Sequence, residues 1–385
     1  MPKSVAIIGT RGYPSYYGGF ETAVRKLAPF LADHGWDVTV YGRKDTTSPD
    51  DSERDARVIS VETAGVESKS LSTLSYGLTA CIHAAWKKPD VALVMNVANG
   101  FWLPLLRLRG IPVVVNVDGI EWERAKWGRF AKAIFRLSAK LTAVFATELV
   151  ADASEIQRRW QVDFRRDSVV IPYGGDIPQP LSIEPGLTAG KYVLVVARFV
   201  PENTVPEFFA AVEALQRVSP VVIVGSSGYA GELDEQAQRL AENYENVRWL
   251  GHVSDDQRLL SLWQHCGVYF HGHSVGGTNP ALVQAMACGA PVVARDTVYN
   301  REVLSDGALY VTPQPEAIST GIVELLANPT SQAEFAEKNE ARARTHYSWE
   351  LVCTGYDNVL ARLSAMVGPN LGSENRVSNL PSGRG

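Results

Sequence analysis

The chain has 385 residues, of which 45% are hydrophobic and 21% are charged, and its formal net charge at pH 7 is −5. These proportions are typical of a soluble globular protein, and the length exceeds what one hydrophobic core usually supports, so we expect two domains. The excess of acidic residues argues against nucleic-acid binding, and the lack of a long apolar run argues against a membrane span. The four cysteines have no paired spacing, which argues against a disulfide framework or a zinc site.

The first residues predict the opening of a nucleotide-type α/β domain. Residues 5–8 form a short strand of the buried type, and a glycine-containing loop then leads to an amphipathic helix that begins near Glu21. A second strand over residues 36–41 completes the order strand, loop, helix, strand. No cleavable leader pattern precedes the first strand, so we expect a cytoplasmic protein.

The glycine loop does not have the pattern of a dinucleotide enzyme. Gly9 and Gly12 lack the G-x-G-x-x-G spacing, and Arg43 follows the second strand where an NAD enzyme needs an acid for the ribose hydroxyls. Gly18 and Gly19 allow the loop to approach a ligand closely, although a flexible loop before a helix would also explain them.

Two further buried strands, residues 91–95 and 113–117, are each followed by a polar segment. Asn99 lies in the first segment, and Asp118 and Glu121 lie in the second. Because ligands bind at the carboxyl ends of parallel strands, these side chains are candidates for a site. The two acids could instead serve turns and helix caps.

A basic amphipathic helix is predicted over residues 124–140. The segment holds six positive residues and no acid, with Trp127, Phe130 and Ile134 on one helical face. Such a helix can rest on an anionic membrane surface. It can equally be an ordinary surface helix whose apolar face packs into the core.

A second α/β half begins after residues 168–176, where prolines at 178 and 180 mark a hinge. Residues 192–197 form a strand, and Arg198 follows it directly. An arginine at the carboxyl end of a strand is well placed to bind an anion, although it could also be a surface residue.

The most specific signal is the stretch 269–302. A buried strand leads into a loop with Gly276 and Gly277, and then into a helix whose first N–H groups Thr278 or Asn279 can cap. Such a loop and helix N-terminus direct free N–H groups and a positive dipole at one point, where a diphosphate would fit. An ordinary strand-loop-helix connection has the same local pattern.

This stretch resembles the donor-binding region of retaining glycosyltransferases of family 4. Residues 285–291 read AMACGAP, which matches the run that follows a core of Glu, seven residues and Glu in that family. Gln284 stands at the second Glu and Gly276 at the first. Residues 271–280, HGHSVGGTNP, are similar to the branch that contains bacterial rhamnosyltransferases of polysaccharide assembly. An amide at 284 can hydrogen-bond a ribose hydroxyl, but without a charge.

The resemblance implies the GT-B architecture, in which two Rossmann-like α/β domains face each other across a cleft. Residues 1–172 would form the acceptor-side domain and residues 173–346 the donor-binding domain. Residues 347–367 would form a C-terminal helix that crosses back to the first domain. Residues 368–385 are polar and are expected to be disordered.

The resemblance also assigns roles to the candidate residues. In the family an Arg and a Lys neutralise the donor diphosphate; Arg198 is present here, whereas Asn203 stands near the place of the Lys. Asp118 takes the position that faces the transferred sugar. The candidates are, as catalytic residues, Asp118, Arg198 and Gly276; as donor contacts, Gly18, Gly19, Arg198, Asn203, Gly277, Thr278, Asn279 and Gln284; and on the acceptor side, Glu21, Asn99 and Glu121.

The implied function is transfer of a sugar from a nucleoside-diphosphate sugar to a saccharide acceptor, with retention of configuration. The branch points to dTDP-L-rhamnose as donor, and acceptors in this family are usually lipid-linked. No Asp-x-Asp pair follows a strand, so we expect no metal, and no cofactor besides the substrate. The alternatives are a nucleotide-sugar 2-epimerase of the same architecture, and a non-catalytic sugar-nucleotide-binding protein, which Gln284 and the missing Lys would favour.

Overall fold

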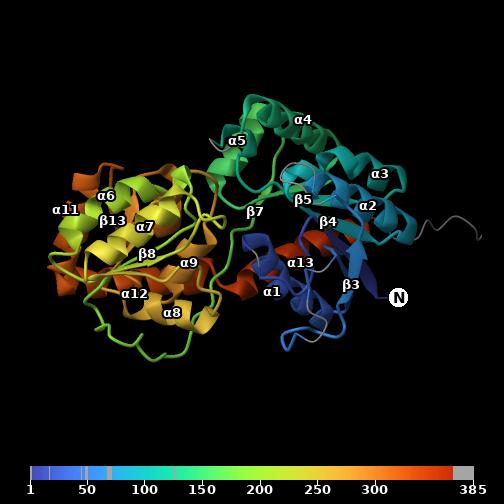
Figure 1. Ribbon diagram of the computed structural model, residues 1–385. Coiled ribbons are helices and arrows are strands. Elements are labelled where there is room, and N and C mark those ends of the chain that lie inside the picture. The colour runs from blue at the N-terminus through green and yellow to red at the C-terminus, as the bar shows by residue number, and fades with distance from the viewer. Residues whose placement is uncertain are drawn as a thin grey trace, which may run out of the picture.

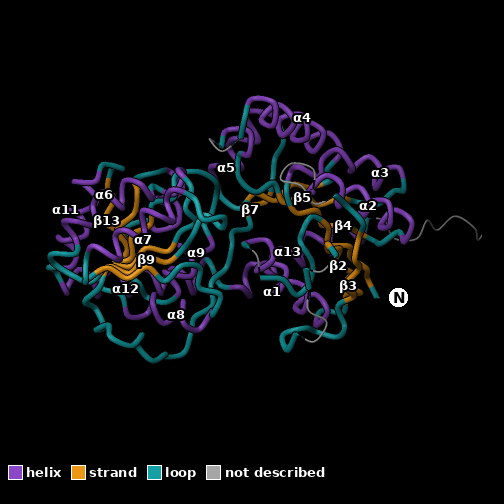
Figure 2. The backbone as a smooth tube through the Cα atoms, viewed as in Figure 1, coloured by secondary structure: helices purple, strands orange, loops and turns teal. Residues whose placement is uncertain are grey.

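The computed structural model describes the protein in two lobes (Figure 1). The described residues are 2–16, 18–44, 46–47, 51–66, 72–124 and 127–366. The tail over residues 368–385, which the sequence predicts to be disordered, therefore lies outside the described residues. Each lobe is a parallel sheet with helices on both faces (Figure 2).

In the described residues, the first lobe holds a seven-stranded parallel sheet with the order β3-β2-β1-β4-β5-β6-β7. Its central strands β4 and β5 are buried along their whole length, as expected for a parallel sheet covered on both faces. The strands are β1 (Lys3–Ile8), β2 (Trp36–Arg43), β3 (Ile59–Thr63), β4 (Val91–Met95), β5 (Val113–Asn116), β6 (Glu148–Ala151) and β7 (Val169–Val170).

Helices cover both faces of this sheet. Helices α1 and α13 pack on one face, and helices α2 to α5 pack on the other. The helices of this lobe are α1 (Gly19–Asp33), α2 (Ser72–Lys87), α3 (Leu103–Leu108), α4 (Arg129–Phe145) and α5 (Ser154–Phe164), with short 3₁₀ turns η1 (Val97–Trp102) and η2 (Glu121–Glu123).

The second lobe repeats the same plan around a six-stranded parallel sheet in the order β10-β9-β8-β11-β12-β13. Its strands are β8 (Val193–Val196), β9 (Val221–Val224), β10 (Val247–Trp249), β11 (Val268–His271), β12 (Val292–Arg295) and β13 (Ala308–Val311). Its helices are η3 (Pro201–Asn203), α6 (Val205–Leu215), α7 (Glu232–Asn243), α8 (Asp256–His265), α9 (Pro280–Ala287), α10 (Val298–Leu304), α11 (Pro315–Leu326) and α12 (Pro329–His346).

The last helix, α13 (Trp349–Ala365), returns to the first lobe, as the sequence predicts (Figure 1). Its apolar face packs on α1 and on the first sheet. Asp357 accepts a hydrogen bond of 2.7 Å from the indole of Trp36, and the Tyr356 hydroxyl accepts one of 2.6 Å from Asn116. These contacts hold α13 against the first lobe, although more than three hundred residues separate this helix from β1.

Both sheets place a topological switch point at the cleft. In the first sheet the strand order reverses between β1 and β4, and in the second between β8 and β11. Ligands of open parallel α/β sheets bind outside the carboxyl ends of the strands at such a point. The loops that follow β1 and β11 contain Gly18, Gly19, Gly276 and Gly277, so the topology brings the two glycine loops to opposite sides of one gap.

Candidate active site

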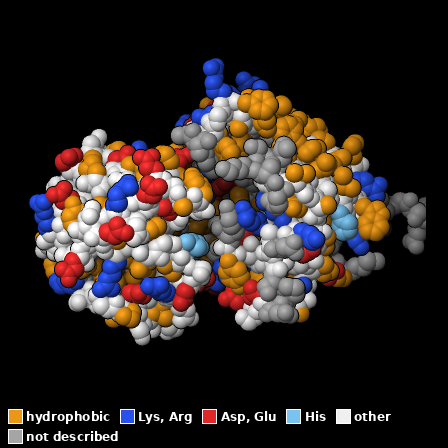
Figure 3. Space-filling model, in the orientation of Figure 1, with side chains coloured by type: hydrophobic (Ala, Val, Ile, Leu, Met, Phe, Trp, Pro, Cys, Tyr) orange, Lys and Arg blue, Asp and Glu red, His pale blue; other side chains and the backbone are white. Residues whose placement is uncertain are grey.

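A cavity of about 1110 Å³ lies between the two lobes and is lined by residues of both. Figure 3 shows the hollow between the lobes in the space-filling view. The candidate residues that line it are Gly18, Gly19, Glu21, Asp118, Glu121, Arg198, Asn203, Gly276, Gly277, Thr278, Asn279 and Gln284. The structure therefore gathers side chains that are up to 266 positions apart in the sequence.

The N-terminal glycine loop approaches the second lobe closely. Gly19 begins α1, and a Cβ added to it would lie 3.0 Å from the Pro280 side chain at the start of α9. A larger residue at this position would therefore require the Pro280 side chain to shift by a few tenths of an ångström. Glu21 in the first turn of α1 accepts a hydrogen bond of 3.2 Å from the Arg11 N–H, which ties the helix to the loop after β1.

Asp118 and Glu121 lie beside each other at the carboxyl end of β5. The backbone of Asp118 has a φ of 55°, a conformation that Asp tolerates better than most residues, and its N–H donates to Asn116 over 2.9 Å. Arg124 pairs with Glu121 at 2.7 Å and with Asp118 at 3.9 Å. Trp127 donates a further hydrogen bond of 2.9 Å to Glu121. Glu121 is thus committed to holding Arg124 and Trp127 in place.

The start of α9 and the loop before it line the cavity. Asn279 caps the helix by accepting from the Ala281 N–H over 2.9 Å, and proline occupies the first helical position. Gly276, with a φ of 96°, lies against Gly119 of the other lobe, where an added Cβ on Gly119 would be 3.0 Å from the Gly276 Cα. The positive end of the α9 dipole therefore lies at the cavity, where it favours an anion.

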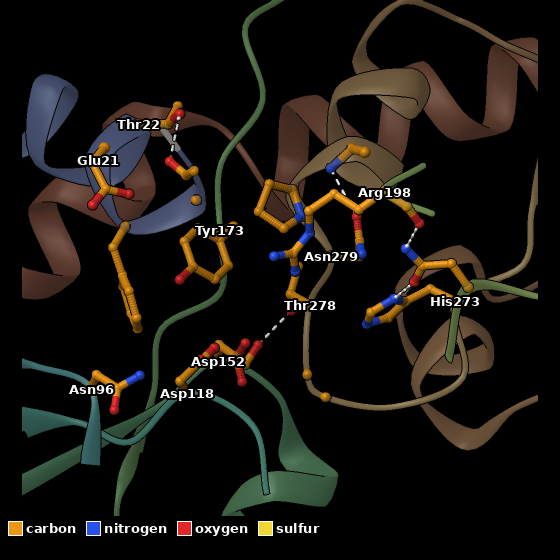
Figure 4. A pocket seen from close by; sticks show the side chains of 18 of the residues that line it. Glu21, Thr22, Asn96, Asp118, Asp152, Tyr173, Arg198, His273, Thr278 and Asn279 are labelled. Carbon is orange, nitrogen blue, oxygen red and sulfur yellow. Dashed lines mark hydrogen bonds between the residues drawn. The ribbon is translucent and has the colours of Figure 1, made fainter. Parts of the chain in front are cut away.

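Arg198 extends into the same cavity from the loop after β8. Figure 4 shows its guanidinium reaching toward Tyr173 and Thr278. The amide of Asn203 donates to the Arg198 carbonyl over 2.9 Å and lies 2.5 Å from the His273 ring. Asn203 lines the cavity, but its side chain holds the Arg198 backbone and His273 and does not replace the charge of a lysine.

Gln284 is held by the segment that connects the lobes. Its carbonyl accepts a hydrogen bond of 3.0 Å from the Asp176 N–H, and its NH₂ group donates one of 2.6 Å to the Asp176 carbonyl. This pairing requires one donor and one acceptor on the same side chain, which an amide has and a carboxylate lacks. The structure thus explains why an amide is suited to position 284.

We predict that Gln284→Glu will lower the free energy of unfolding by about 1–3 kcal/mol, because the new carboxylate faces the Asp176 carbonyl without a proton to donate. Thermal or urea unfolding at neutral pH measures the change. The control is Gln161→Glu, an exposed position on α5, where we expect a change within about 0.5 kcal/mol. Equal stability of Gln284→Glu and the parent would show that this pairing is not formed.

Asn99 is the candidate that the structure does not bring to the cavity. Its side chain is completely buried in η1 and donates to the Met95 carbonyl over 3.0 Å, so the assignment to an acceptor contact is corrected. The cavity is lined instead by Asn96, whose φ of 76° turns the chain at the end of β4. Because the 3₁₀ turn η1 follows β4, Asn96 lines the cavity and Asn99 is turned into the core. The sequence pattern did not indicate this turn.

Two groups that the sequence analysis did not select also line the cavity. Asp152 follows β6 directly, so the signal that singles out Asp118, an acid after a buried strand, could have found it. His273 follows β11 and is partly buried, and desolvation together with Arg124 and Arg198 lowers its pKa to about 3. The His273 imidazole is therefore neutral at physiological pH and adds no charge to the anion site.

Within the residues described above, no group of three or more His, Cys, Asp or Glu side chains is arranged to hold a metal ion. In the same part of the chain, none of the helices combines the length and the apolar character needed to cross a membrane. The four cysteines are all buried and unpaired.

The fold is GT-B, as the resemblance implied. The structure is similar to sucrose-phosphate synthase from Thermosynechococcus elongatus, with a TM-score of 0.79, 18% identity, and coverage of 94% of this chain and 100% of that one. It is also similar to HepE of Anabaena in complex with UDP, with a TM-score of 0.71, 17% identity, and coverage of 94% and 100%.

Sequence comparison finds a family model that matches most of the second half. Residues 184–342 match the family model described as Glycosyl transferases group 1, and residues 2–176 match a domain of unknown function, DUF1972. The phosphatidyl-myo-inositol mannosyltransferase of Mycobacterium tuberculosis is 31% identical over 216 residues, which are 52% of this chain and 56% of the relative. O-antigen chain mannosyltransferase B of Escherichia coli is 26% identical over 167 residues, 41% of this chain and 42% of the relative. The chain thus matches about half the length of these curated relatives.

Proposed function

We propose that the protein is a glycosyltransferase that moves a sugar from a nucleoside-diphosphate sugar to a saccharide acceptor. The observation that carries the proposal is the convergence of Arg198 and the N-terminus of α9 on one point of the interlobe cavity, with Asp118 on the opposite wall. A guanidinium and the positive end of a helix dipole stabilise the charge that develops on a departing diphosphate. The match of residues 184–342 to group 1 glycosyltransferases supports this function.

In the proposed reaction the configuration at the sugar is retained. The departing phosphate would accept the proton of the acceptor hydroxyl on the face of the sugar that it leaves, so no side-chain base is needed. Asp118 would orient the sugar, and Arg198 with the positive end of the α9 dipole would hold the diphosphate without a bridging metal. Contact between the lobes would exclude the water that otherwise hydrolyses the donor.

For the donor we propose dTDP-L-rhamnose, on the resemblance of residues 271–280 to the rhamnosyltransferase branch. A screen of dTDP-, UDP- and GDP-linked sugars for thermal stabilisation tests this choice, because a ligand at a hundred times its Kd adds about 2.7 kcal/mol. Turnover with the best donor is then measured with and without an acceptor saccharide. Conversion of the donor alone would support the epimerase, and binding without transfer would support the non-catalytic alternative.

For the acceptor we propose a lipid-linked saccharide. On the first-lobe side, residues of α2, η1 and α4 and the segment before α4 line the cavity. Several of them are apolar: Leu74, Phe101, Trp127, Ile134 and Phe135. Apolar walls have little use for a free sugar, but they can bury a hydrocarbon chain attached to the saccharide.

We further propose that α4 and its surroundings contact an anionic membrane. The helix begins at Arg129 rather than at residue 124, and Phe130, which the sequence places on its apolar face, is 80% exposed. Leu137 and Val144 are also exposed, and Figure 3 shows hydrophobic side chains gathered over α3 and α4. The helix carries four Lys and Arg residues and no acid, so its outer surface complements a layer of anionic lipid headgroups.

Membrane contact predicts measurable binding to vesicles. The chain should sediment with vesicles that contain anionic phospholipid and much less with purely zwitterionic ones. Replacing Arg136 and Lys140 with Gln should weaken binding by at least about tenfold, since each basic residue near the surface contributes about 1 kcal/mol. The matched control replaces Arg217 and Arg239, exposed arginines of the second lobe, and should bind as the parent does. Equal binding to both kinds of vesicle would contradict the proposal.

A further inference from the structure

Asp152 lies at the junction of the two lobes. Its side chain is 2% exposed, and among the described residues its Oδ1 has no hydrogen-bond partner. Gly277 of the second lobe covers this oxygen, because a Cβ added to Gly277 would lie only 1.9 Å from it. A carboxylate oxygen enclosed in this way has lost its water without gaining a donor, which strongly disfavours the charged form.

Other contacts close the same junction. The Thr278 hydroxyl donates a hydrogen bond to the Asp152 carbonyl (Figure 4). Glu302 of α10 accepts hydrogen bonds from the N–H groups of Ser154 at 2.6 Å and Glu155 at 3.4 Å. Glu302 thereby caps α5, whose own N-cap residue, Ala153, has no side chain that could do so. Three separate interactions therefore join the segment after β6 to the second lobe.

The charges around Asp152 come from several elements. Burial raises its pKa well above the usual range, and the nearby carboxylate of Asp118 raises it further, whereas Arg124 opposes this rise and Glu302 adds to it. Three tyrosines also face it, Tyr173 between the lobes, Tyr299 on α10 and Tyr356 on α13. None of these neighbours supplies the missing hydrogen bond to Oδ1.

We propose that closure of the two lobes is coupled to the uptake of one proton by Asp152, so that this carboxyl acts as a pH-sensitive latch. When the lobes separate, Gly277 moves away and water reaches the carboxylate, which then ionises at its ordinary pKa. When they close, the neutral acid is the form that fits. The inference concerns the lobes themselves and does not depend on which ligand the cavity binds.

The direction of the pH dependence follows from linkage. The closed form binds the proton more tightly, so closure is most favourable below the ordinary aspartate pKa of about 3.9 and weakens as the pH rises above it. For a single proton the closure constant falls by up to tenfold per pH unit, until the raised pKa of the closed form is passed. Asparagine at 152 is neutral at every pH and should remove the dependence.

Fluorescence energy transfer between the lobes measures closure without any substrate. Dyes are attached to cysteines introduced by Asp37→Cys in the first lobe and Val218→Cys in the second, both exposed, while the native cysteines are buried. Between pH 5 and 8 we expect the closed fraction to fall with rising pH. Asp152→Asn should stay closed throughout, and the control Asp167→Asn, an exposed acid beyond α5, should follow the parent.

A second series of measurements, in protein that carries Thr278→Val, keeps the equilibrium between open and closed lobes within the measurable range. Thr278→Val removes the hydroxyl that bonds to the Asp152 carbonyl, so it should shift closure toward the open form at every pH while leaving the slope unchanged. Thermal unfolding of each variant at each pH confirms that the fold is intact. The proposal is overturned if the closed fraction does not vary with pH in either background, or if Asp152→Asn keeps the dependence of the parent. If the protein did not turn over donor sugars, the measured pH dependence of lobe closure would still test this proposal.

Discussion

Replacing Arg198 with Ala should lower turnover by about 10²- to 10³-fold, the loss typical of one group that stabilises developing charge, or about 2.7–4 kcal/mol. The guanidinium is the cation that Figure 4 shows reaching into the cavity, close to the N-terminus of α9. Because that charge matters most as the diphosphate departs, kcat should fall more than affinity for the nucleoside diphosphate. Steady-state kinetics and a nucleotide titration separate the two effects.

Two variants make this result specific. Arg198→Lys keeps the charge but loses the planar fork, so its turnover should lie between those of the parent and Arg198→Ala. Arg217→Ala removes an exposed arginine that pairs with Glu213 in the adjoining helix, and it should behave as the parent does. Turnover of Arg198→Ala within threefold of the parent would show that the departing group is stabilised elsewhere.

Gly277→Ala should reduce turnover by about 10²-fold or more while nucleotide binding to the second lobe persists. The new methyl group would occupy the space of the Asp152 carboxyl, 1.9 Å from its Oδ1, so the lobes could not reach their closed positions. Displacement of reacting groups by about 1 Å is enough for a loss of this size. The measurements are kcat with saturating substrates and the Kd of the nucleoside diphosphate.

The matched control for this prediction is Gly128→Ala. Gly128 also lines the cavity, but an added Cβ there meets nothing within 4 Å, and its φ of −69° suits any residue. We expect its turnover to equal that of the parent. If Gly277→Ala retained full turnover, close contact between Gly277 and Asp152 would not be part of the catalytic cycle.

The sequence alone determined the parts of this protein that depend on short-range patterns. The short, valine-rich apolar runs over residues 91–95 and 113–115 favour buried strands of a parallel sheet, and the glycine loop before Pro280 indicates where α9 begins. Arg198 was found for the same reason, because a charged residue directly after a buried strand must lie at the sheet edge. These features place the cleft and most of its lining.

The tertiary structure decided what depends on contacts between distant segments. The Gln284 amide pairs with Asp176, 108 residues away, and Asp152 meets Thr278 at a separation of 126 residues. The outward position of Phe130 and the burial of Asn99 depend on how α4 and η1 pack against each other. Local periodicity carries no information about such pairings, because the energy of a buried polar group is set by the partner that the fold brings to it.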